Sequence, residues 1–246
     1  MKNLFVPILL ACLSVSFTVL PTEQANNRRI AATNFSFTHS DIHNSTTVDI
    51  SSALYDDMSL QQYGLSKEAF TYALKGYQNL LRKNLIRRTD YITVCDFSQS
   101  SKQKRLYLID IAEGKLILNT YVAHGRNSGA EYATRFSNKP SSLQSSLGFY
   151  VTEGTYIGEH GLALKINGVD AGYNDKAYKR HIVIHGADYI TEGWLHHSNY
   201  MGRSYGCPAI PKNESESIIN TIKNGTCLFI YHPDKNYLLR SKILNG

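Results

Sequence analysis

The sequence contains little cysteine and almost no tryptophan, with four Cys and one Trp among 246 residues. A small domain held together by disulfides is therefore excluded, because such domains are short and dense in cysteine. Disorder is excluded as well, since 42% of the residues are hydrophobic and 19% are charged, an ordinary balance for a globular chain. A chain of this length can bury a substantial core.

The sequence also lacks a concentrated basic surface. Lys and Arg exceed Asp and Glu by 26 to 20, which gives a net charge of +6 with His neutral. The densest basic stretches are 87–88 and 102–105, and neither forms a stripe interleaved with aromatic residues. We therefore expect no nucleic-acid partner, while a mild positive charge fits an acidic polymer or a substrate that carries carboxylates.

Long apolar runs are missing except at the N-terminus, where residues 4–20 are mostly apolar. This run is too short and too polar for a membrane-spanning helix, so residues 1–25 are predicted to be an export signal. Cleavage could follow Ser16 or lie nearer Ala25, and an uncleaved anchor is the alternative. The residues around Cys12 resemble a lipoprotein box, but the apolar run continues past Cys12, so a lipid anchor there is not favoured.

The segment 26–86 is predicted to be a flexible arm followed by a helix. Residues up to about 50 are rich in Asn, Thr and Ser and show no apolar period. A helix is predicted at 66–83, because Ser66 can cap it and apolar residues recur at helical spacing. Leu65 and Phe70 occupy the two positions of a hydrophobic staple around that cap.

From residue 91 onward the apolar period approaches two, and short apolar runs alternate with turn signals. Strands are predicted at 91–97, 106–111, 115–122, 149–151, 162–166, 181–185 and 227–232. The second and third should form a hairpin, and a helix is predicted at 214–223. Seven short strands with few helices predict one mostly-β domain over 87–246, either a sandwich or an open barrel, with the first helix docked on it.

Three cysteines remain after the export signal, and they have different settings. Cys95 and Cys227 lie in strand-like apolar runs, so they are expected to be buried thiols or a mutual disulfide. Cys207 lies in a loop-like stretch between Gly206 and Pro208. A lone thiol in a loop of an exported protein is a candidate nucleophile.

His185 is the candidate partner of Cys207, because a strand at 181–185 would deliver it to a strand end before Gly186. A neighbouring imidazole can take the proton of a thiol and so create the nucleophilic thiolate. Gly206 lets a substrate approach the backbone, and the amides of Gly206 and Cys207 could form an oxyanion hole. Pro208 confines Cys207 to extended dihedral angles.

These motifs resemble a known family. His185-Gly186, followed about twenty residues later by Ser204-x-Gly206-Cys207, resembles the signature of the L,D-transpeptidase (YkuD-type) catalytic domain. The segments 122–129 and 145–150, together with Gly-Cys-Pro-Ala at 206–209, resemble its murein L,D-transpeptidase branch. The resemblance covers about 88–232. Papain-like and NlpC/P60-type cysteine hydrolases fit less well, because they place Cys before His in the chain.

The resemblance implies a mostly-β enzyme that acts on bacterial peptidoglycan stem peptides without a metal or cofactor. It assigns Cys207 as nucleophile, His185 as general base, and Ser204 and Gly206 as residues that shape the site. The implied reaction is an acyl transfer from stem tetrapeptides that forms 3-3 cross-links, in the periplasm or cell envelope of a bacterium. The alternatives are an L,D-carboxypeptidase that trims tetrapeptide to tripeptide and a non-catalytic wall-binding protein. The oligomeric state stays open.

The chain departs from the commoner family pattern at two positions. Tyr205 stands where that pattern often has His, and Ala209 stands where it often has Arg. A substrate carboxylate would then be bound by Arg203 or Arg126, beside Tyr205, although each arginine could equally be a solvated surface residue.

The remaining histidines do not predict a zinc site. His181 and His185 would be about 13 Å apart along one strand, too far to share an ion, and the pair 196–197 has no ligand at suitable spacing. His124 and His160 each precede a glycine and either line the cleft or occupy turns. The group that orients His185 could be Asp188, Tyr189 or a backbone carbonyl.

Overall fold

The computed structural model describes residues 47–246, with side chains from residue 50 onward. The expected export signal at 1–25, including Cys12, lies outside the described residues. The described residues all belong to one compact unit. Among them, no helix combines the length and the apolar character needed to cross a membrane.

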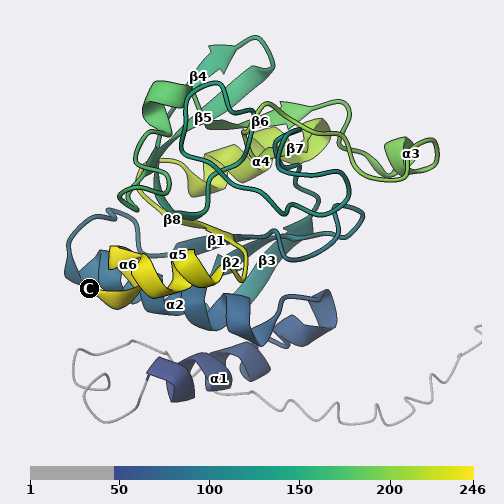
Figure 1. Cartoon of the computed structure of the whole chain (residues 1–246). Coiled ribbons are helices and arrows are strands. Elements are labelled where there is room, and N and C mark those ends of the chain that lie inside the picture. Colours follow the sequence, from purple (N-terminus) through teal and green to yellow (C-terminus); the bar gives the residue numbers. More distant parts are fainter. Residues whose placement is uncertain (1–46) are drawn as a thin grey trace, which may run out of the picture. The chain divides into compact units, whose positions relative to one another are not determined.

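The centre of the fold is an eight-stranded sheet with the strand order β3-β2-β1-β8-β4-β5-β6-β7 (Figure 1). The strands are β1 (Tyr91–Asp96), β2 (Leu106–Asp110), β3 (Lys115–Thr120), β4 (Gly148–Gly158), β5 (Gly161–Gly168), β6 (Val183–Ala187), β7 (Ala209–Pro211) and β8 (Cys227–Tyr231). Neighbours are antiparallel except for the parallel pairs β1–β8 and β6–β7. The two parallel pairs join strands that are far apart in sequence.

The two edges of this sheet meet at a single bridge. Ala123, just after β3, pairs antiparallel with Ala209 of β7, and its amide lies 2.8 Å from the Ala209 carbonyl. The sheet is therefore nearly closed, which confirms the open-barrel form of the predicted mostly-β fold.

All seven predicted strands are present, but three details differ from prediction. The strand predicted at 149–151 continues to Gly158, because β4 pairs with β5 along a long hairpin that projects from the sheet (Figure 1). The strand predicted at 181–185 begins only at Val183, since His181 has a left-handed φ of 55° that ends a turn. Strand β7 was missed because it is three residues long and ends in proline.

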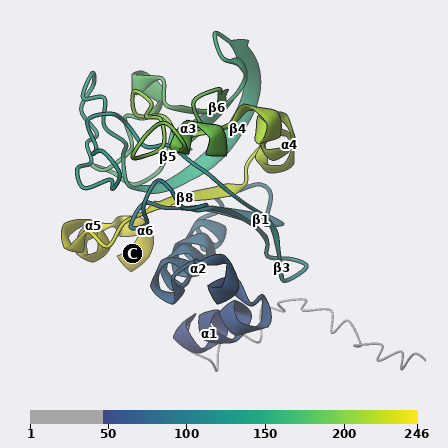
Figure 2. The ribbon, with the colours of Figure 1, turned by 90° about the vertical axis from the view of Figure 1, so that its right-hand side faces the viewer.

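The helix predicted at 66–83 is α2 (Lys67–Arg82), and its predicted start is confirmed. The Ser66 hydroxyl accepts a hydrogen bond from the Ala69 amide at 3.1 Å, and the staple residues Leu65 and Phe70 are both buried. The helix lies against β1 and β8, as Figure 2 shows.

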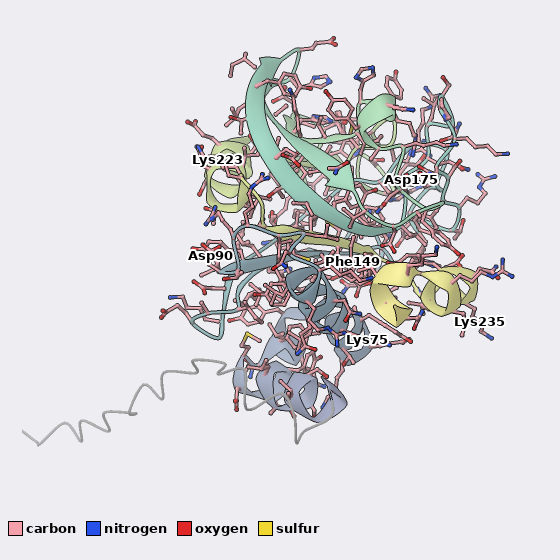
Figure 3. All side chains as sticks on the ribbon, turned by 90° about the vertical axis from the view of Figure 1, so that its left-hand side faces the viewer. Lys75, Asp90, Phe149, Asp175, Lys223 and Lys235 are labelled. Atoms are coloured by element: carbon pink, nitrogen blue, oxygen red, sulfur yellow. The ribbon has the colours of Figure 1, made fainter. Side chains whose placement is uncertain are left out.

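The contact between α2 and the sheet is closest at Gly76. A Cβ atom at Gly76 would stand 1.9 Å from Cζ of Phe149, the side chain that Figure 3 labels between α2 and the strands. Phe149 is fully buried and its ring stacks on Phe229, with centroids 4.0 Å apart. Glycine at this position therefore sets the distance between the helix and the sheet.

Replacing Gly76 by alanine should lower the stability of the protein. Overpacking a tight core costs about 1–3 kcal/mol, which exceeds the gain of about 1 kcal/mol from the better helix former. We expect a melting temperature lower by several degrees in a thermal denaturation experiment. Gly154→Ala is the matched control, because nothing lies within 4 Å of its added Cβ. Equal melting temperatures for Gly76→Ala and the wild type would contradict the close contact.

The other helices are α1 (Thr47–Asp57), η2 (Leu60–Tyr63), η3 (Tyr178–Arg180), α3 (Glu192–Leu195), α4 (Lys212–Ile222), α5 (Lys235–Arg240) and α6 (Lys242–Asn245). The helices α1 and α6 pack on α2. Helix α4 corresponds to the helix predicted at 214–223 and packs on β5, β6 and β7. The helices α1, α5 and α6 were not predicted.

The C-terminal helices are attached to the core through Asp170. This buried carboxylate accepts hydrogen bonds from Tyr237 Oη at 3.0 Å and Ser241 Oγ at 2.5 Å. It also accepts one from the Phe149 amide at 2.8 Å, next to the α2 contact. The segment after the last strand is thus part of the folded unit.

Cys95 and Cys227 are buried free thiols. They lie on the adjacent strands β1 and β8, but the register pairs Cys227 with Ile92 and Cys95 with Ile230. An offset of three residues separates the two cysteines by about 10 Å along the strands and places their side chains on opposite faces. A disulfide between them would need the backbone to move, so of the two alternatives the structure supports the thiols.

Candidate active site

The predicted site residues meet in one cleft of about 1040 Å³ beside β4, β5 and β6. Six of the seven line it directly, namely Arg126, His185, Arg203, Ser204, Tyr205 and Cys207. The seventh, Gly206, joins Tyr205 to Cys207. Segments more than 75 residues apart in sequence therefore contribute to the same surface.

The Cys207 thiol lies half-buried against the start of β6. Its Sγ accepts a hydrogen bond from the Val183 amide at 3.5 Å and lies 3.7 Å from the His181 carbonyl. Burial raises the pKa of the thiol, while the Val183 amide and the charge of Arg180 act in the opposite direction. The resting group is therefore the thiol at neutral pH.

His185 lies inside β6, not at its end as the sequence suggested. It pairs in parallel register with Ala209 of β7, two residues after Cys207, and both His185 and Cys207 line the cleft. Its Nδ1 is 3.0 Å from the Gly186 carbonyl, which can only accept. Nδ1 therefore carries the hydrogen, and Nε2 is the nitrogen free to accept a proton.

The group that orients His185 is thus the backbone carbonyl of Gly186. Neither side-chain candidate takes this role. Asp188 forms an ion pair with Lys212 at 2.8 Å, and Tyr189 lines the cleft.

A second imidazole covers His185. His160, in the turn between β4 and β5, stacks on its ring with centroids 4.6 Å apart and planes 23° apart. Burial lowers the pKa of His185, the Gly186 carbonyl raises it, and His160 lowers it further. His185 is therefore neutral at pH 7. His160 thus lines the cleft and also occupies a turn, which were the two alternatives that its sequence position predicted.

Ser204 and Gly206 shape the turn that presents Cys207. Gly206 has φ of +127°, and a Cβ there would lie 2.8 Å from the Gln144 carbonyl, so only glycine fits without strain. The Ser204 hydroxyl accepts from the Gly206 amide at 3.0 Å and donates to the Cys207 carbonyl at 2.6 Å.

This turn corrects the predicted oxyanion hole. The Gly206 amide is already used by Ser204, so it is not the second donor that the sequence suggested. Of the two predicted donors, the Cys207 amide is therefore the one that can donate to a developing oxyanion.

His124 supports the same turn from behind and does not line the cleft. It is fully buried, its carbonyl accepts from the Ser204 amide at 3.0 Å, and its Nδ1 lies 2.7 Å from the guanidinium of Arg105. Burial and the charge of Arg105 lower the pKa of His124 to about 3. A neutral His124 can accept from the buried Arg105, so this pair is structural.

The two arginines predicted to bind a substrate carboxylate differ in how far their guanidinium groups are free to do so. Arg203 donates to the Gly129 carbonyl at 3.0 Å and packs over the ring of Tyr200 at 4.8 Å. The Arg126 side chain is exposed, with its guanidinium 5.8 Å from the centroid of the Tyr205 ring. Arg126 is therefore the guanidinium that a substrate can reach more readily.

Sequence comparison decides the family. Residues 61–231, about two thirds of the chain, match the L,D-transpeptidase catalytic domain. The chain belongs to the L,D-transpeptidase catalytic domain family. The match begins before α2, so it reaches further towards the N-terminus than the expected 88–232 and includes the docked helix.

The comparison with solved structures matches L,D-transpeptidases over part of this chain. An L,D-transpeptidase from Mycobacterium smegmatis has 10% identity and a TM-score of 0.36, covering 58% of this chain and 59% of that chain. L,D-transpeptidase 3 from Mycobacterium tuberculosis, in complex with a faropenem-derived adduct, has 13% identity and a TM-score of 0.36, covering 58% and 60%. This chain therefore spans about three fifths of their length. A search of the curated proteins returned no match.

Arg180 is a residue of the cleft that the sequence did not reveal. Its guanidinium donates to the carbonyls of Ser137 and Gln144, each at 2.7 Å, and so holds the loop that faces Gly206. Its charge also lowers the pKa of Cys207. No motif marks an arginine that lies 27 positions before the cysteine.

Metal ligands are not clustered in the described part of this chain. Between residues 50 and 246, no three His, Cys, Asp or Glu side chains could hold one ion. His181 and His185 are on separate elements, because His181 ends the η3 turn. The absence of a cofactor stays a prediction.

The three described thiols of this chain should differ in reactivity. Burial raises the pKa of Cys95 to about 12 and raises that of Cys227 as well, whereas Cys207 is half-buried in the cleft. In a Cys12→Ser variant, a disulfide reagent should titrate one thiol in the native protein and three after denaturation. A single thiol after denaturation would instead indicate a Cys95–Cys227 disulfide.

Proposed function

We propose that the chain is a peptidoglycan L,D-transpeptidase that acts through a Cys207 acyl-enzyme on stem tetrapeptides and forms 3-3 cross-links. The supporting observation is the arrangement of Cys207 and His185 in one cleft, with Nε2 of His185 left free by the Gly186 carbonyl. The family membership supports the general reaction.

Acylation starts from a neutral pair. His185 Nε2 takes the thiol proton as Sγ of Cys207 attacks the carbonyl between the third residue of the stem and the terminal D-Ala. The C–S bond forms, the C–N bond breaks, and His185 returns the proton to the amine of the leaving D-Ala. The Cys207 amide stabilises the oxyanion of the tetrahedral intermediate.

The thioester is then resolved by an amine of a second stem. His185 accepts a proton from that amine, the new C–N bond forms as the C–S bond breaks, and His185 returns the proton to the sulfur, so that the Cys207 thiol is regenerated with the cross-link complete. Water in place of the amine gives the tripeptide, which is the carboxypeptidase alternative. Both outcomes use the same acyl-enzyme, so the reaction is decided by whether an acceptor amine or only water reaches the thioester in the cleft.

Substrate carboxylates would be bound by Arg126, the exposed guanidinium of the cleft. Arg203 assists from its position over Tyr200, where its second role is to hold the Gly129 carbonyl. Peptidoglycan stems carry several carboxylates, which agrees with the net charge of +6. We propose export to the periplasm or cell envelope of a bacterium, from the residues at 1–25, with lipidation at Cys12 not favoured.

The decisive experiment is incubation with purified disaccharide-tetrapeptide, followed by mass spectrometry. A cross-linked dimer with release of D-Ala supports transpeptidation, whereas tripeptide alone supports the carboxypeptidase. No product, together with no labelling of Cys207 by a thiol-directed probe, would leave the wall-binding alternative.

A carbapenem should acylate Cys207, since a strained lactam carbonyl offers the thiolate the same tetrahedral chemistry as the stem. Intact-protein mass spectrometry should show one adduct on the wild type and none on Cys207→Ala. EDTA should make no difference to either adduct or turnover. Loss of activity in EDTA that zinc restores would overturn the metal-free mechanism.

A further inference from the structure

The cleft of this chain has an aromatic rim. Five of its lining residues are aromatic, namely Tyr156, Tyr189, Trp194, Tyr200 and Tyr205. Three of them are well exposed, with 40% of Tyr156, 42% of Trp194 and 69% of Tyr205 accessible. Neither the thiol chemistry nor carboxylate binding needs exposed rings, so the rim is unexplained by the proposed reaction.

Trp194 is fixed in place as a flat surface. Its Nε1 donates to the Tyr200 carbonyl at 3.1 Å, and its ring contacts that of Tyr189 edge-on with centroids 6.3 Å apart. The short helix that carries it is capped by the Thr191 hydroxyl, which accepts from the Trp194 amide at 3.1 Å. Because the indole N–H is already satisfied, a ligand meets the face of the ring and not its polar edge.

Tyr205 adds a second surface with a charged donor beside it. Its ring is the most exposed of the rim, and the Arg126 guanidinium lies 5.8 Å from its centroid. Arg203 in turn lies over the ring of Tyr200, 4.8 Å from its centroid. Each arginine therefore places hydrogen-bond donors next to an aromatic face.

Flat rings bordered by fixed donors suit a saccharide. One face of a pyranose presents C–H groups that pack on an aromatic ring, while its hydroxyl and N-acetyl oxygens point outward and accept hydrogen bonds. An aliphatic side chain would need an enclosed apolar pocket instead, without donors at its edge. The cleft volume of about 1040 Å³ is at the upper end of small-molecule sites, so it has room beyond the reacting peptide.

We propose that the aromatic rim, through Trp194 and Tyr205 and with the adjacent Arg126 and Arg203, binds sugar rings of the peptidoglycan strand, so that the enzyme selects stems attached to glycan over free peptides. This inference rests on the proposed function for the identity of the glycan. It gives Tyr205, which replaces the His of the commoner pattern, a role in substrate selection.

The single tryptophan of the chain makes the inference directly measurable, because all indole fluorescence comes from the rim. The Cys207→Ala protein is titrated with disaccharide-tetrapeptide and, separately, with the free tetrapeptide. We expect the disaccharide form to change the emission and to bind at least about tenfold more tightly than the peptide. An equal response to both ligands, or none to the disaccharide form, would overturn the proposal.

The second test is the steady-state kinetics of Trp194 variants that retain Cys207. Trp194→Ala should raise KM for the disaccharide-tetrapeptide about tenfold, with kcat and the KM for free tetrapeptide unchanged within about twofold. Trp194→Phe should restore most of the affinity. Tyr178→Ala is the matched control, since Tyr178 is 66% exposed but does not line the cleft. Equal KM changes for both substrates would show that Trp194 supports the fold or binds peptide.

The two tests separate this inference from the proposed function. If neither ligand is turned over but the disaccharide form alone changes the Trp194 emission, the saccharide site stands and the reaction fails. If both ligands are turned over with equal kcat/KM, the reaction stands and the saccharide site fails.

Discussion

Alanine in place of Cys207 should reduce turnover of the disaccharide-tetrapeptide by at least about a thousandfold and abolish covalent labelling by a carbapenem. The reason is chemical, since alanine cannot form the thioester. Stability should change little, because the half-buried thiol makes two long hydrogen bonds, with the Val183 amide and the His181 carbonyl, and loses only one sulfur atom of core contact. Turnover, labelling and the melting temperature are measured on the same preparation.

Cys95→Ala is the matched control for this experiment. Cys95 is fully buried in β1, so its removal should lower the melting temperature while leaving both turnover and labelling intact. Retained turnover in Cys207→Ala would end the acyl-enzyme mechanism. Lost turnover in Cys95→Ala, with a normal melting temperature, would show that the essential thiol had been misassigned.

The fold was predictable where local pattern and tertiary structure agree. The helix start at Ser66 follows from a cap and a staple, both of which are local interactions. Strands such as β1 and β8 follow from continuous apolar runs, which are buried on both faces because α2 covers one of them. Strand β7 could not be predicted, because three residues that end in a proline become a strand only by pairing with β6 and Ala123.

The reactive residues of the site were predictable from the sequence, but the hydrogen bonds that hold them in place were not. A thiol in a Gly-flanked turn and a histidine on a strand are visible in the sequence, and the structure places Cys207 and His185 in one cleft. The Ser204–Gly206 hydrogen bond is not visible, because it depends on the side-chain direction in the turn. Arg180 was missed for the same reason, since its partners lie 34 to 43 residues away.

The burial of the cleft residues determines the resting state of the Cys207–His185 pair. Burial raises the pKa of the thiol and lowers that of the imidazole, so both groups are shifted away from their charged forms. The pair therefore rests as thiol and neutral imidazole rather than as thiolate and imidazolium. In the proposed mechanism the proton therefore moves during the attack, and His185 acts as a general base and not merely as a counter-ion.

Replacing His185 by alanine should reduce the acylation rate by at least about a hundredfold at neutral pH, the usual scale of general-base catalysis. In the wild type the rate should fall in acid as His185 becomes protonated, with a midpoint below 6.5 because burial lowers its pKa. That midpoint belongs to the coupled pair. In His185→Ala the residual rate should instead keep rising above pH 9, since the thiolate must form without a base and burial raises the Cys207 pKa.

His160→Asn provides the matched control for this assignment. Removing the stacked ring takes away one cause of the lowered His185 pKa and exposes His185 to water, so both effects move the acid midpoint to higher pH. The rate above pH 8 should stay close to that of the wild type, because His185 is neutral there with or without His160. A large loss at all pH values in His160→Asn, with normal acylation in His185→Ala, would make His160 the base.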